Sequence, residues 1–507
     1  MGAGNHQDTL AIEAALSRPT LLPVMSATPA DHAAACLAWL AGRSVAEIDA
    51  ALGDLTHPTY AHADALGDAA DGGDPSGIGA LFGGLVEPLN DGFTPAGRAG
   101  YARWFAHICW RVGTRDERIA AQLAKFGISE EAALHARYQA ARSQPATPPR
   151  TARKVVVLSR VTIGADLLLT TVALQRLRRA YPEAELVVLG DGKLQALIGG
   201  FPGVRVRAVA YGRRGTLRER LASWLAVVEA VAAEAPELVF APDSRLDQLG
   251  ILPVVTDPAH YLLWENVLPD GQALSLARAL DGFLAARFAQ PATPPVEPRT
   301  QLDASTILIN ERLAAALDTT KPLAAVKLDH GGNPAKALPR AAEVAVLRRL
   351  RELGWRVLLD RGFGATELAN SDALLTDAGW TMVDLDDSGQ GFGLAINELA
   401  PGSLASAPVV RFHGSIGGWA AACATCRLAV SYDSVGHHLA AGLGVPVVTA
   451  FTGHADARFA VAWKPHGPGV VTLVEIPTAA KDNPAQWQRL LAALPVPSAA
   501  RSAPPAL

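Results

Sequence analysis

Hydrophobic positions change their spacing once along the chain, near residue 150. Before that point they recur every three or four residues, as in "DHAAACLAWLAGRSVAEIDAALGDL" and "GRAGYARWFAHICWRV", and no run alternates as a strand would. This spacing predicts amphipathic helices. We therefore expect residues 1–150 to form an all-α module, followed by a linker in the Pro-rich stretch "SQPATPPRTAR".

From Lys154 onward, short β-branched runs alternate with helical segments, which is typical of parallel sheets wrapped by helices. The Pro-rich segment "AQPATPPVEPRTQ" divides the runs into two sets. The first set is "KVVVLSR", "ELVVLG", "VRVRAVAY", "ELVFAPD" and "HYLLWEN"; the second is "LAAVKLD", "WRVLLD", "TMVDLD", "VVRF", "LAVSY" and "VPVVTAF". The sequence thus predicts an α/β fold with two Rossmann-like, doubly wound domains, residues 151–300 and 301–507, which face each other across a cleft.

Composition narrows the class of protein. Half of the 507 residues are apolar, and 45 basic against 49 acidic side chains give a formal charge of -4 with both signs scattered. No basic stripe for nucleic acid or an anionic membrane is present. The N-terminus lacks the pattern of a signal peptide, and Glu229 interrupts the most apolar helical stretch, so we expect no membrane span.

Four cysteines are too few for a disulfide framework, which favours a cytoplasmic location. The "CATC" stretch at 423–426 has no second pair to complete a zinc site. We expect buried thiols there rather than a metal or redox centre.

Polar residues follow five of the apolar runs in the second set. Loops beyond the carboxyl ends of parallel strands are where α/β sheets bind ligands, because they meet helix N-termini there. Turn chemistry could explain any one of these groups, but five at one edge predict a ligand-binding rim. The groups are Asp329 to Gly332, Asp360 to Gly362, His413 to Ser415, Asp433 with Ser434, and Thr452 to His454.

The stretch "SYDSVGHHLAAGLG" holds the most polar of these groups. Asp433 or Ser434 can cap a helix that begins near Val435, so that its free N–H groups and the positive end of its dipole face an anion in the cleft. Adjacent helical residues point about 100° apart. At most one of His437 and His438 can therefore serve the site, and position favours His438.

Two lysines are candidates for binding a diphosphate. Lys327 ends a buried run, and Lys336 lies in the loop before the next helix. A lysine close to helix N-termini is a suitable point charge for phosphate groups. An ordinary surface lysine explains either position as well.

Two acidic residues have alternative roles. Asp166 begins the helix after "KVVVLSR", where Gly164 permits a tight turn, and it could cap that helix or accept a proton from an attacking hydroxyl. The stretch "WRVLLDRGFGATELANSD" has part of a dinucleotide-binding fingerprint, with Asp384 near the position of the ribose acid. Glu367 occupies the third glycine position, so a contact from Glu367 to a ribose or base is the better interpretation.

Three stretches together resemble glycosyltransferase family 9, the heptosyltransferase-like enzymes of GT-B fold, over roughly residues 154–475. They are "RVTIGADLLLTTVALQRLRRAYPEAELVVLG", "KALP" and "YDSVGHHLAAGLGVPVVTAF". The chain departs from the family pattern by an inserted Ala165, by Leu338 in place of Trp, by Val435 in place of Gly, and by "TGHAD" in a usual Gly-Pro-Thr run.

The resemblance implies an inverting, metal-independent enzyme without a cofactor. Such an enzyme moves a sugar from a nucleoside-diphosphate donor, for example ADP-heptose, to a hydroxyl of a carbohydrate, lipid-linked or protein acceptor. It implies that Asp166 is the catalytic base, that Lys336 binds phosphate, and that Asp433 and the motif histidine His438 contact the donor. Glu367 would lie near the nucleoside.

Two other functions stay open at the level of sequence. One is a non-catalytic GT-B scaffold that supports the helical module as an interaction domain, and the other is a GT-B sugar-nucleotide epimerase. Residues 1–150 have no counterpart in the family pattern. They suggest an unusual acceptor, a partner protein or an oligomer contact.

Overall fold

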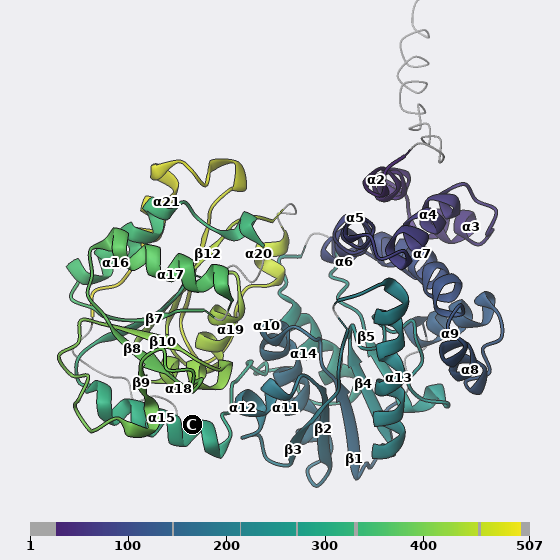
Figure 1. The fold of residues 1–507 in the computed structure, drawn as a ribbon. Helices are drawn as coiled ribbons and strands as arrows, with labels where there is room; N and C mark the ends of the chain where they lie inside the picture. Colours follow the sequence, from purple (N-terminus) through teal and green to yellow (C-terminus); the bar gives the residue numbers. More distant parts are fainter. Residues whose placement is uncertain are drawn as a thin grey trace, which may run out of the picture.

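Two parallel β-sheets, each with helices on both faces, form the body of the molecule (Figure 1). They confirm the predicted α/β fold with two Rossmann-like units. The computed structural model describes residues 27–143, 147–212, 214–269, 272–328, 333–362, 364–454 and 458–497.

The first sheet, sheet A, has the strand order β3-β2-β1-β4-β5, and every neighbouring pair is parallel. All five strands come from runs that the sequence predicted. They are β1 (Lys154–Leu158), β2 (Glu185–Gly190), β3 (Val204–Ala208), β4 (Leu238–Pro242) and β5 (Tyr261–Trp264). The helical segments between and after them are α10 (Ile163–Ala165), η3 (Asp166–Thr170), α11 (Thr171–Ala180), η4 (Gly192–Leu194), α12 (Gln195–Ile198), α13 (Leu217–Glu234), η5 (Pro258–His260) and α14 (Leu276–Arg287).

The second sheet, sheet B, has the order β13-β12-β11-β6-β7-β10-β8-β9 and is also parallel throughout. Six strands match predicted runs: β6 (Leu323–Lys327), β7 (Arg356–Asp360), β8 (Val383–Asp386), β10 (Val409–His413), β11 (Leu428–Tyr432) and β12 (Val447–Phe451). The edge strands β9 (Leu394–Ala395) and β13 (Val471–Glu475) were not predicted. The helical segments are α15 (Ala304–Leu317), η6 (Pro334–Lys336), α16 (Arg340–Glu352), α17 (Ala365–Ala378), η7 (Ile396–Glu398), α18 (Ile416–Ala424), α19 (Val435–Gly442), α20 (Arg458–Ala462), η8 (Thr478–Ala480) and α21 (Pro484–Ala493).

Before Lys154 the described residues form helices and no strand. Local signals start several of them: Thr28 and Ser44 make capping boxes, and Thr94 caps a helix with Pro95 at its first position. No helix in the described ranges is long and apolar enough to cross a membrane. These helical segments are α2 (Pro29–Leu40), α3 (Val45–Leu52), α4 (Thr59–Asp71), α5 (Pro75–Gly79), η2 (Ala80–Val86), α6 (Glu87–Asp91), α7 (Pro95–Gly113), α8 (Glu117–Lys125) and α9 (Glu131–Ser143).

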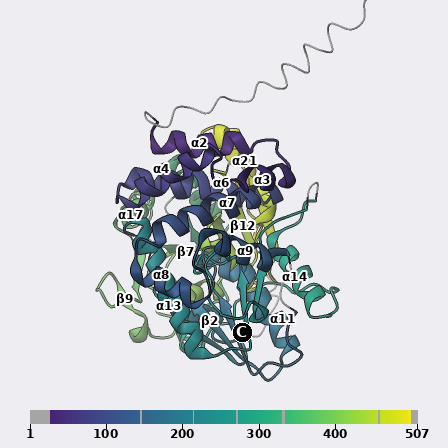
Figure 2. The ribbon, with the colours of Figure 1, turned by 90° about the vertical axis from the view of Figure 1, so that its right-hand side faces the viewer.

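This helical module covers one face of sheet A rather than standing apart from it (Figures 1 and 2). Val156 and Leu158 of β1 belong to the same hydrophobic cluster as Trp104 of α7 and Trp224 of α13. The alternate residues of β1, Val155 and Val157, point to the opposite face, toward α11 and α14. Because both faces of a parallel sheet must be buried, the module completes the first domain.

The order of strands places the loops that matter most. In sheet A the chain moves from β1 out to β3 and then returns to β4 on the other side of β1. In sheet B it moves from β6 out through β7 and later returns to β11 on the other side of β6. A crevice opens beyond the carboxyl ends of the strands at each such reversal. The loops after β1, β4, β6 and β11 are therefore the first places to look for a site.

The two α/β units contact each other through α10 of the first and α19 of the second. Figure 1 shows both helices between the two halves of the molecule. A Cβ atom placed on Gly164 would lie 3.2 Å from His438 Cδ2 and 3.4 Å from the Val435 Cα. Gly164 does not have the positive φ that a tight turn would need. A glycine is therefore needed at position 164 because α19 approaches closely, and not because of the tight turn that the sequence suggested.

A buried ion-pair network ties the helical module to the carboxyl edge of sheet A. Asp243, just after β4, accepts from Arg98 Nη2 of α7 at 2.7 Å and from Arg160 Nη1, just after β1, at 2.6 Å. The side chains of Arg98 and Asp243 are each 1% exposed. Asp243 holds a left-handed backbone with φ 56°, which costs energy for a residue with a side chain. Three segments are thus fixed by one carboxylate.

Loss of this network should destabilise the protein strongly. Arg98→Met leaves the buried Asp243 carboxylate without one of its partners, and we expect a loss of about 3–5 kcal/mol in the first unfolding transition, measured by urea denaturation. The matched control is Arg103→Met on the same helix, whose partner Asp49 lies at 3.3 Å and is 41% exposed. It should cost less than about 1 kcal/mol. Equal effects of the two substitutions would contradict this role of Arg98.

Filling the contact between α10 and α19 should also be costly. Gly164→Val forces bulk against His438 and Val435, and we expect about 1–3 kcal/mol of destabilisation, seen as a lower melting temperature. Gly282 in α14 has open space where its Cβ would be, so Gly282→Val should change stability by less than about 0.5 kcal/mol. A Gly164→Val protein as stable as the Gly282→Val protein would show that the two halves do not depend on this contact.

Candidate active site

A cavity of about 1810 Å³ lies between the carboxyl edges of the two sheets. It is larger than the roughly 300–1,000 Å³ that holds one drug-sized ligand, so two substrates fit side by side. Its walls come from the loops after β1, β2, β3 and β4, from the loops after β6, β11 and β12, and from the helical module. The polar and charged residues that line it are Glu87, Asp91, Arg160, Thr162, Asp191, Lys193, Tyr211, Arg214, Arg245, Asn333, Lys336, Asp433, Ser434, His438 and His454.

On the sheet B wall, the N-terminus of α19 opens into the cavity. Ser434 is the N-cap residue, and its Oγ accepts the Gly436 N–H at 3.4 Å. Of the two capping candidates in the sequence, Ser434 therefore caps the helix. The cap leaves the positive end of the helix dipole facing the cavity, which favours an anion there.

Lys336 is held beside this helix N-terminus. Its Nζ lies 2.6 Å from Asp433 Oδ2 and donates to the Asp433 backbone carbonyl at 3.1 Å. The same ammonium lies 5.6 Å from the centre of the Phe459 ring. The segment η6, which Asn333 caps, thus delivers a cation to the point where α19 begins.

The two adjacent histidines have different surroundings. His437 is fully buried, its Nδ1 lies 3.1 Å from Thr449 Oγ1, and its ring stacks on Phe451. His438 lines the cavity, and its Nδ1 has no hydrogen-bond partner in the described part of the chain. Burial lowers the pKa of His437 to about 3 and lowers the pKa of His438 well below its usual value, so both imidazoles are neutral.

Asp166 lies beneath the cavity and is not among the residues that line it. Its carboxylate accepts hydrogen bonds from Ser159 Oγ at 2.7 Å, Thr170 Oγ1 at 2.6 Å and the Arg160 N–H at 2.8 Å. The residue is 1% exposed, and burial raises its pKa. Asp166 begins the π-helical segment η3, whose wider turn accommodates one extra residue such as the inserted Ala165. It supports the Arg160 loop from below, and its role as a base stays a prediction.

Lys327 and Glu367 also lie away from the cavity lining. Lys327 forms an ion pair with Asp360 under α19. Glu367 accepts the Gly364 N–H at 3.2 Å and so caps α17. Asp384, the candidate ribose acid of a dinucleotide site, is paired with Arg411 at 2.6 Å.

Of the predicted site residues, the structure brings Lys336, Asp433, Ser434 and His438 together at the cavity. From the predicted rim, Gly453 and His454 also line it. Residues 329–332 of that rim lie outside the described residues. Asp360 and His413 are turned to other partners: His413 Nδ1 lies 3.2 Å from the Gly362 carbonyl.

Arg160 and two carboxylates of the helical module, Glu87 and Asp91, are cavity residues that the sequence reasoning missed. Arg160 follows β1 directly, so the rule that ligands sit at the carboxyl ends of strands could have found it. Its guanidinium lies 5.8 Å from the centre of the Trp463 ring, across the cavity from sheet A. Glu87 and Asp91 carried no such signal, because nothing in the sequence tells where a preceding helical module packs.

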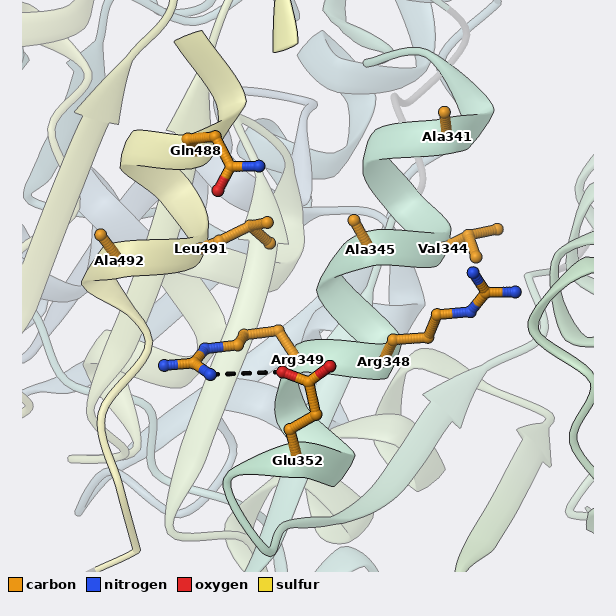
Figure 3. A pocket seen from close by; sticks show the side chains of 9 residues that line it. All are labelled: Ala341, Val344, Ala345, Arg348, Arg349, Glu352, Gln488, Leu491 and Ala492. Carbon is orange, nitrogen blue, oxygen red and sulfur yellow. Dashed lines mark hydrogen bonds and ion pairs between the residues drawn. The ribbon is translucent and has the colours of Figure 1, made fainter. Parts of the chain in front are cut away.

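A second, smaller hollow of about 470 Å³ lies between α16 and α21 (Figure 3). Its charged side chains include Arg349 and Glu352, which form an exposed pair at 3.2 Å. No loop at a strand end reaches it, so it offers little for catalysis. Among the described residues, no group of three or more His, Cys, Asp or Glu side chains is arranged to hold a metal ion.

No family model matches the chain, and no curated protein matches it in sequence. Its structure is similar to that of a family 9 glycosyl transferase from Veillonella parvula, with 17% identity, a TM-score of 0.46, and coverage of 64% of this chain and 86% of that one. It is also similar to the ADP-heptose lipopolysaccharide heptosyltransferase II of E. coli, with 15% identity, a TM-score of 0.44, and coverage of 67% and 96%. A putative UDP-N-acetylglucosamine 2-epimerase from Listeria monocytogenes is similar at 12% identity and a TM-score of 0.32, over 67% of this chain and 88% of that one.

Proposed function

We propose that the protein is an inverting glycosyltransferase that moves a sugar from a nucleoside-diphosphate donor to an acceptor hydroxyl. The observation that carries the proposal is Lys336 beside the N-terminus of α19, on one wall of a cavity formed by two opposed sheet edges. That wall attracts a diphosphate, and the opposite wall leaves room for a second substrate. The motifs that resemble family 9 of the glycosyltransferases fall on the same residues.

The chemistry of the donor explains why this wall should be cationic. When the bond between the anomeric carbon and the diphosphate breaks, negative charge accumulates on the leaving phosphate oxygens. Lys336 and the free N–H groups of α19 are fixed before the reaction and can stabilise that charge. They offer a route that requires no divalent metal ion and no organic cofactor.

Asp433 and His438 are placed to bind the sugar of the donor. The Asp433 carboxylate is held by Lys336 and can accept hydrogen bonds from sugar hydroxyls. The neutral imidazole of His438 has a buried nitrogen, Nδ1, without a partner in the described chain, which a sugar hydroxyl could satisfy. Neither Lys327 nor Glu367 touches the cavity, so we assign them supporting roles within sheet B instead of donor contacts.

The acceptor is then bound by the sheet A wall and the helical module. With the diphosphate on the sheet B side, an acceptor hydroxyl arrives at the anomeric carbon from the opposite side. Attack from that direction inverts the configuration at the anomeric carbon.

Lys336→Met should weaken nucleoside-diphosphate binding by about 1.5–3 kcal/mol, the scale of a hydrogen bond to a charged group. Isothermal titration calorimetry with ADP, UDP and GDP measures the effect and identifies the base. The matched control is Lys321→Met, since Lys321 is exposed at the opposite end of sheet B and, among the described residues, its Nζ donates to the Ala405 carbonyl alone. It should leave the affinity unchanged.

Two outcomes would contradict the proposed function. Equal affinity of the Lys336→Met and wild-type proteins would remove the phosphate contact. Wild-type protein that binds none of the three nucleotides would instead favour a non-catalytic scaffold, because a transferase of this kind must bind the nucleoside diphosphate of its donor.

A further inference from the structure

The helical module brings two carboxylates into the cavity from the short helix α6. Glu87 and Asp91 stand one helical turn apart at its two ends, and both line the cavity together with Gly83 and Gly92. Figure 1 shows α6 on the side of the module that faces α20. Acidic side chains from outside both sheets therefore reach the space where the two substrates would meet.

The position of Asp91 is fixed from both sides. Before it, Asn90 Nδ2 donates to the Val86 carbonyl at 2.7 Å. After it, Phe93 holds a left-handed backbone with φ 50°. Its ring is buried in the hydrophobic cluster that also contains Val155 and Val157, on the face of sheet A toward α11 and α14. The Phe93 carbonyl accepts the Leu268 N–H at 2.9 Å. A strained residue held by tertiary packing is typical of functional loops.

Charged groups from every wall of the cavity surround the Asp91 carboxylate. Glu87 acts on it from α6, Arg160 and Arg245 from sheet A, and Lys336 from sheet B. Asp91 is partly buried, and no hydrogen bond or ion pair joins its carboxylate to another side chain of the described chain. Burial, and then the charge of Glu87, raise its pKa to about 6 despite the three cations. The group is therefore mostly ionised at pH 7, yet more basic than an ordinary aspartate.

The contrast with Asp166 is clear. Both carboxylate oxygens of Asp166 accept hydrogen bonds, from three donors in all, and Asp166 does not line the cavity; Asp91 lines the cavity, and its carboxylate has no such partner among the described residues. A general base must reach the proton that it removes. Of these two residues, only Asp91 lines the cavity where the acceptor would lie.

We propose that Asp91, a residue of the helical module, is the catalytic base of the transfer; this inference rests on the proposed function. The acceptor hydroxyl gives its proton to an Asp91 carboxylate oxygen while its own oxygen forms a bond to the anomeric carbon of the donor. The bond from that carbon to the phosphate oxygen breaks, and its electron pair leaves with the nucleoside diphosphate. Lys336 and α19 hold the charge that the leaving group gains.

The test uses donor hydrolysis by the full chain, in which water replaces the acceptor. ADP-heptose, UDP-glucose and GDP-mannose are the probes, and release of nucleoside diphosphate is followed between pH 4.5 and pH 8, a range of about 1.5–2 units on each side of the pKa. The wild-type kcat/KM for hydrolysis should rise through a midpoint near pH 6 and level off above it, because Asp91 of the donor-free enzyme must be ionised to accept a proton.

Asp91→Asn should lower hydrolysis by about 10²- to 10⁴-fold and abolish the dependence on pH near 6, while the calorimetric affinity for the nucleoside diphosphate changes less than about twofold. Asp91→Glu should restore part of the rate, and the rate should again fall at low pH. Glu130→Gln removes one exposed carboxylate from the same module and should leave rate and profile unchanged. Asp166→Asn should keep the midpoint near pH 6 even where it lowers the melting temperature.

The results separate two failures. Nucleotide binding by the wild type, with an unchanged rate in Asp91→Asn or with no hydrolysis of any probe, would overturn the assignment of the base and leave the donor site standing. If the fall of the rate at low pH disappeared in Asp166→Asn but not in Asp91→Asn, Asp166 would be the catalytic base. Absence of nucleotide binding in the wild type would overturn the proposed function itself.

Discussion

The Asp243 carboxylate is the point on which the architecture of the cavity depends. It binds Arg98 from the first turn of α7 and Arg160 from the loop after β1, and the charged groups of all three side chains are largely buried. Two guanidinium groups around one buried carboxylate are stable only while every partner stays in place, because each would otherwise be an uncompensated charge. The helical module and sheet A are therefore held together at the edge of the sheet that borders the cavity.

That lock also sets the position of α6. Only a short turn, Gly92 to Thr94, separates the end of α6 from the beginning of α7, and Phe93 within it is buried in the core under sheet A. When Arg98 fixes the start of α7, this short connection restrains the position of Asp91 at the end of α6. The module thus does two things at once: together with α13 it covers one face of sheet A, and it adds the carboxylates of Glu87 and Asp91 to the cavity.

The sequence could predict the sheets because short, apolar, β-branched runs alternate with helical segments along the chain. The edge strands β9 and β13 were missed because short or half-exposed strands lack that pattern. It also placed Lys336, Asp433, Ser434 and His438 at a strand edge. It could not place Asp166, because whether a carboxylate at a helix start faces a ligand or its own loop depends on a single residue of register, here in a π-helical segment. Asp91 was beyond reach, since its role depends on packing between segments far apart in the chain.

The charges of the cavity are coupled, and this gives the proposed donor a second effect. Lys336 acts on Asp91 across the cavity and holds the pKa of that carboxyl below the value that burial and Glu87 alone would give. A diphosphate bound to Lys336 would neutralise this cation and place negative charge on the same side. Both changes disfavour the ionised form of Asp91 and so make it a stronger base. Proton removal from the acceptor would then be favoured most when the donor is in place, because the same lysine contacts the leaving group and tunes the base.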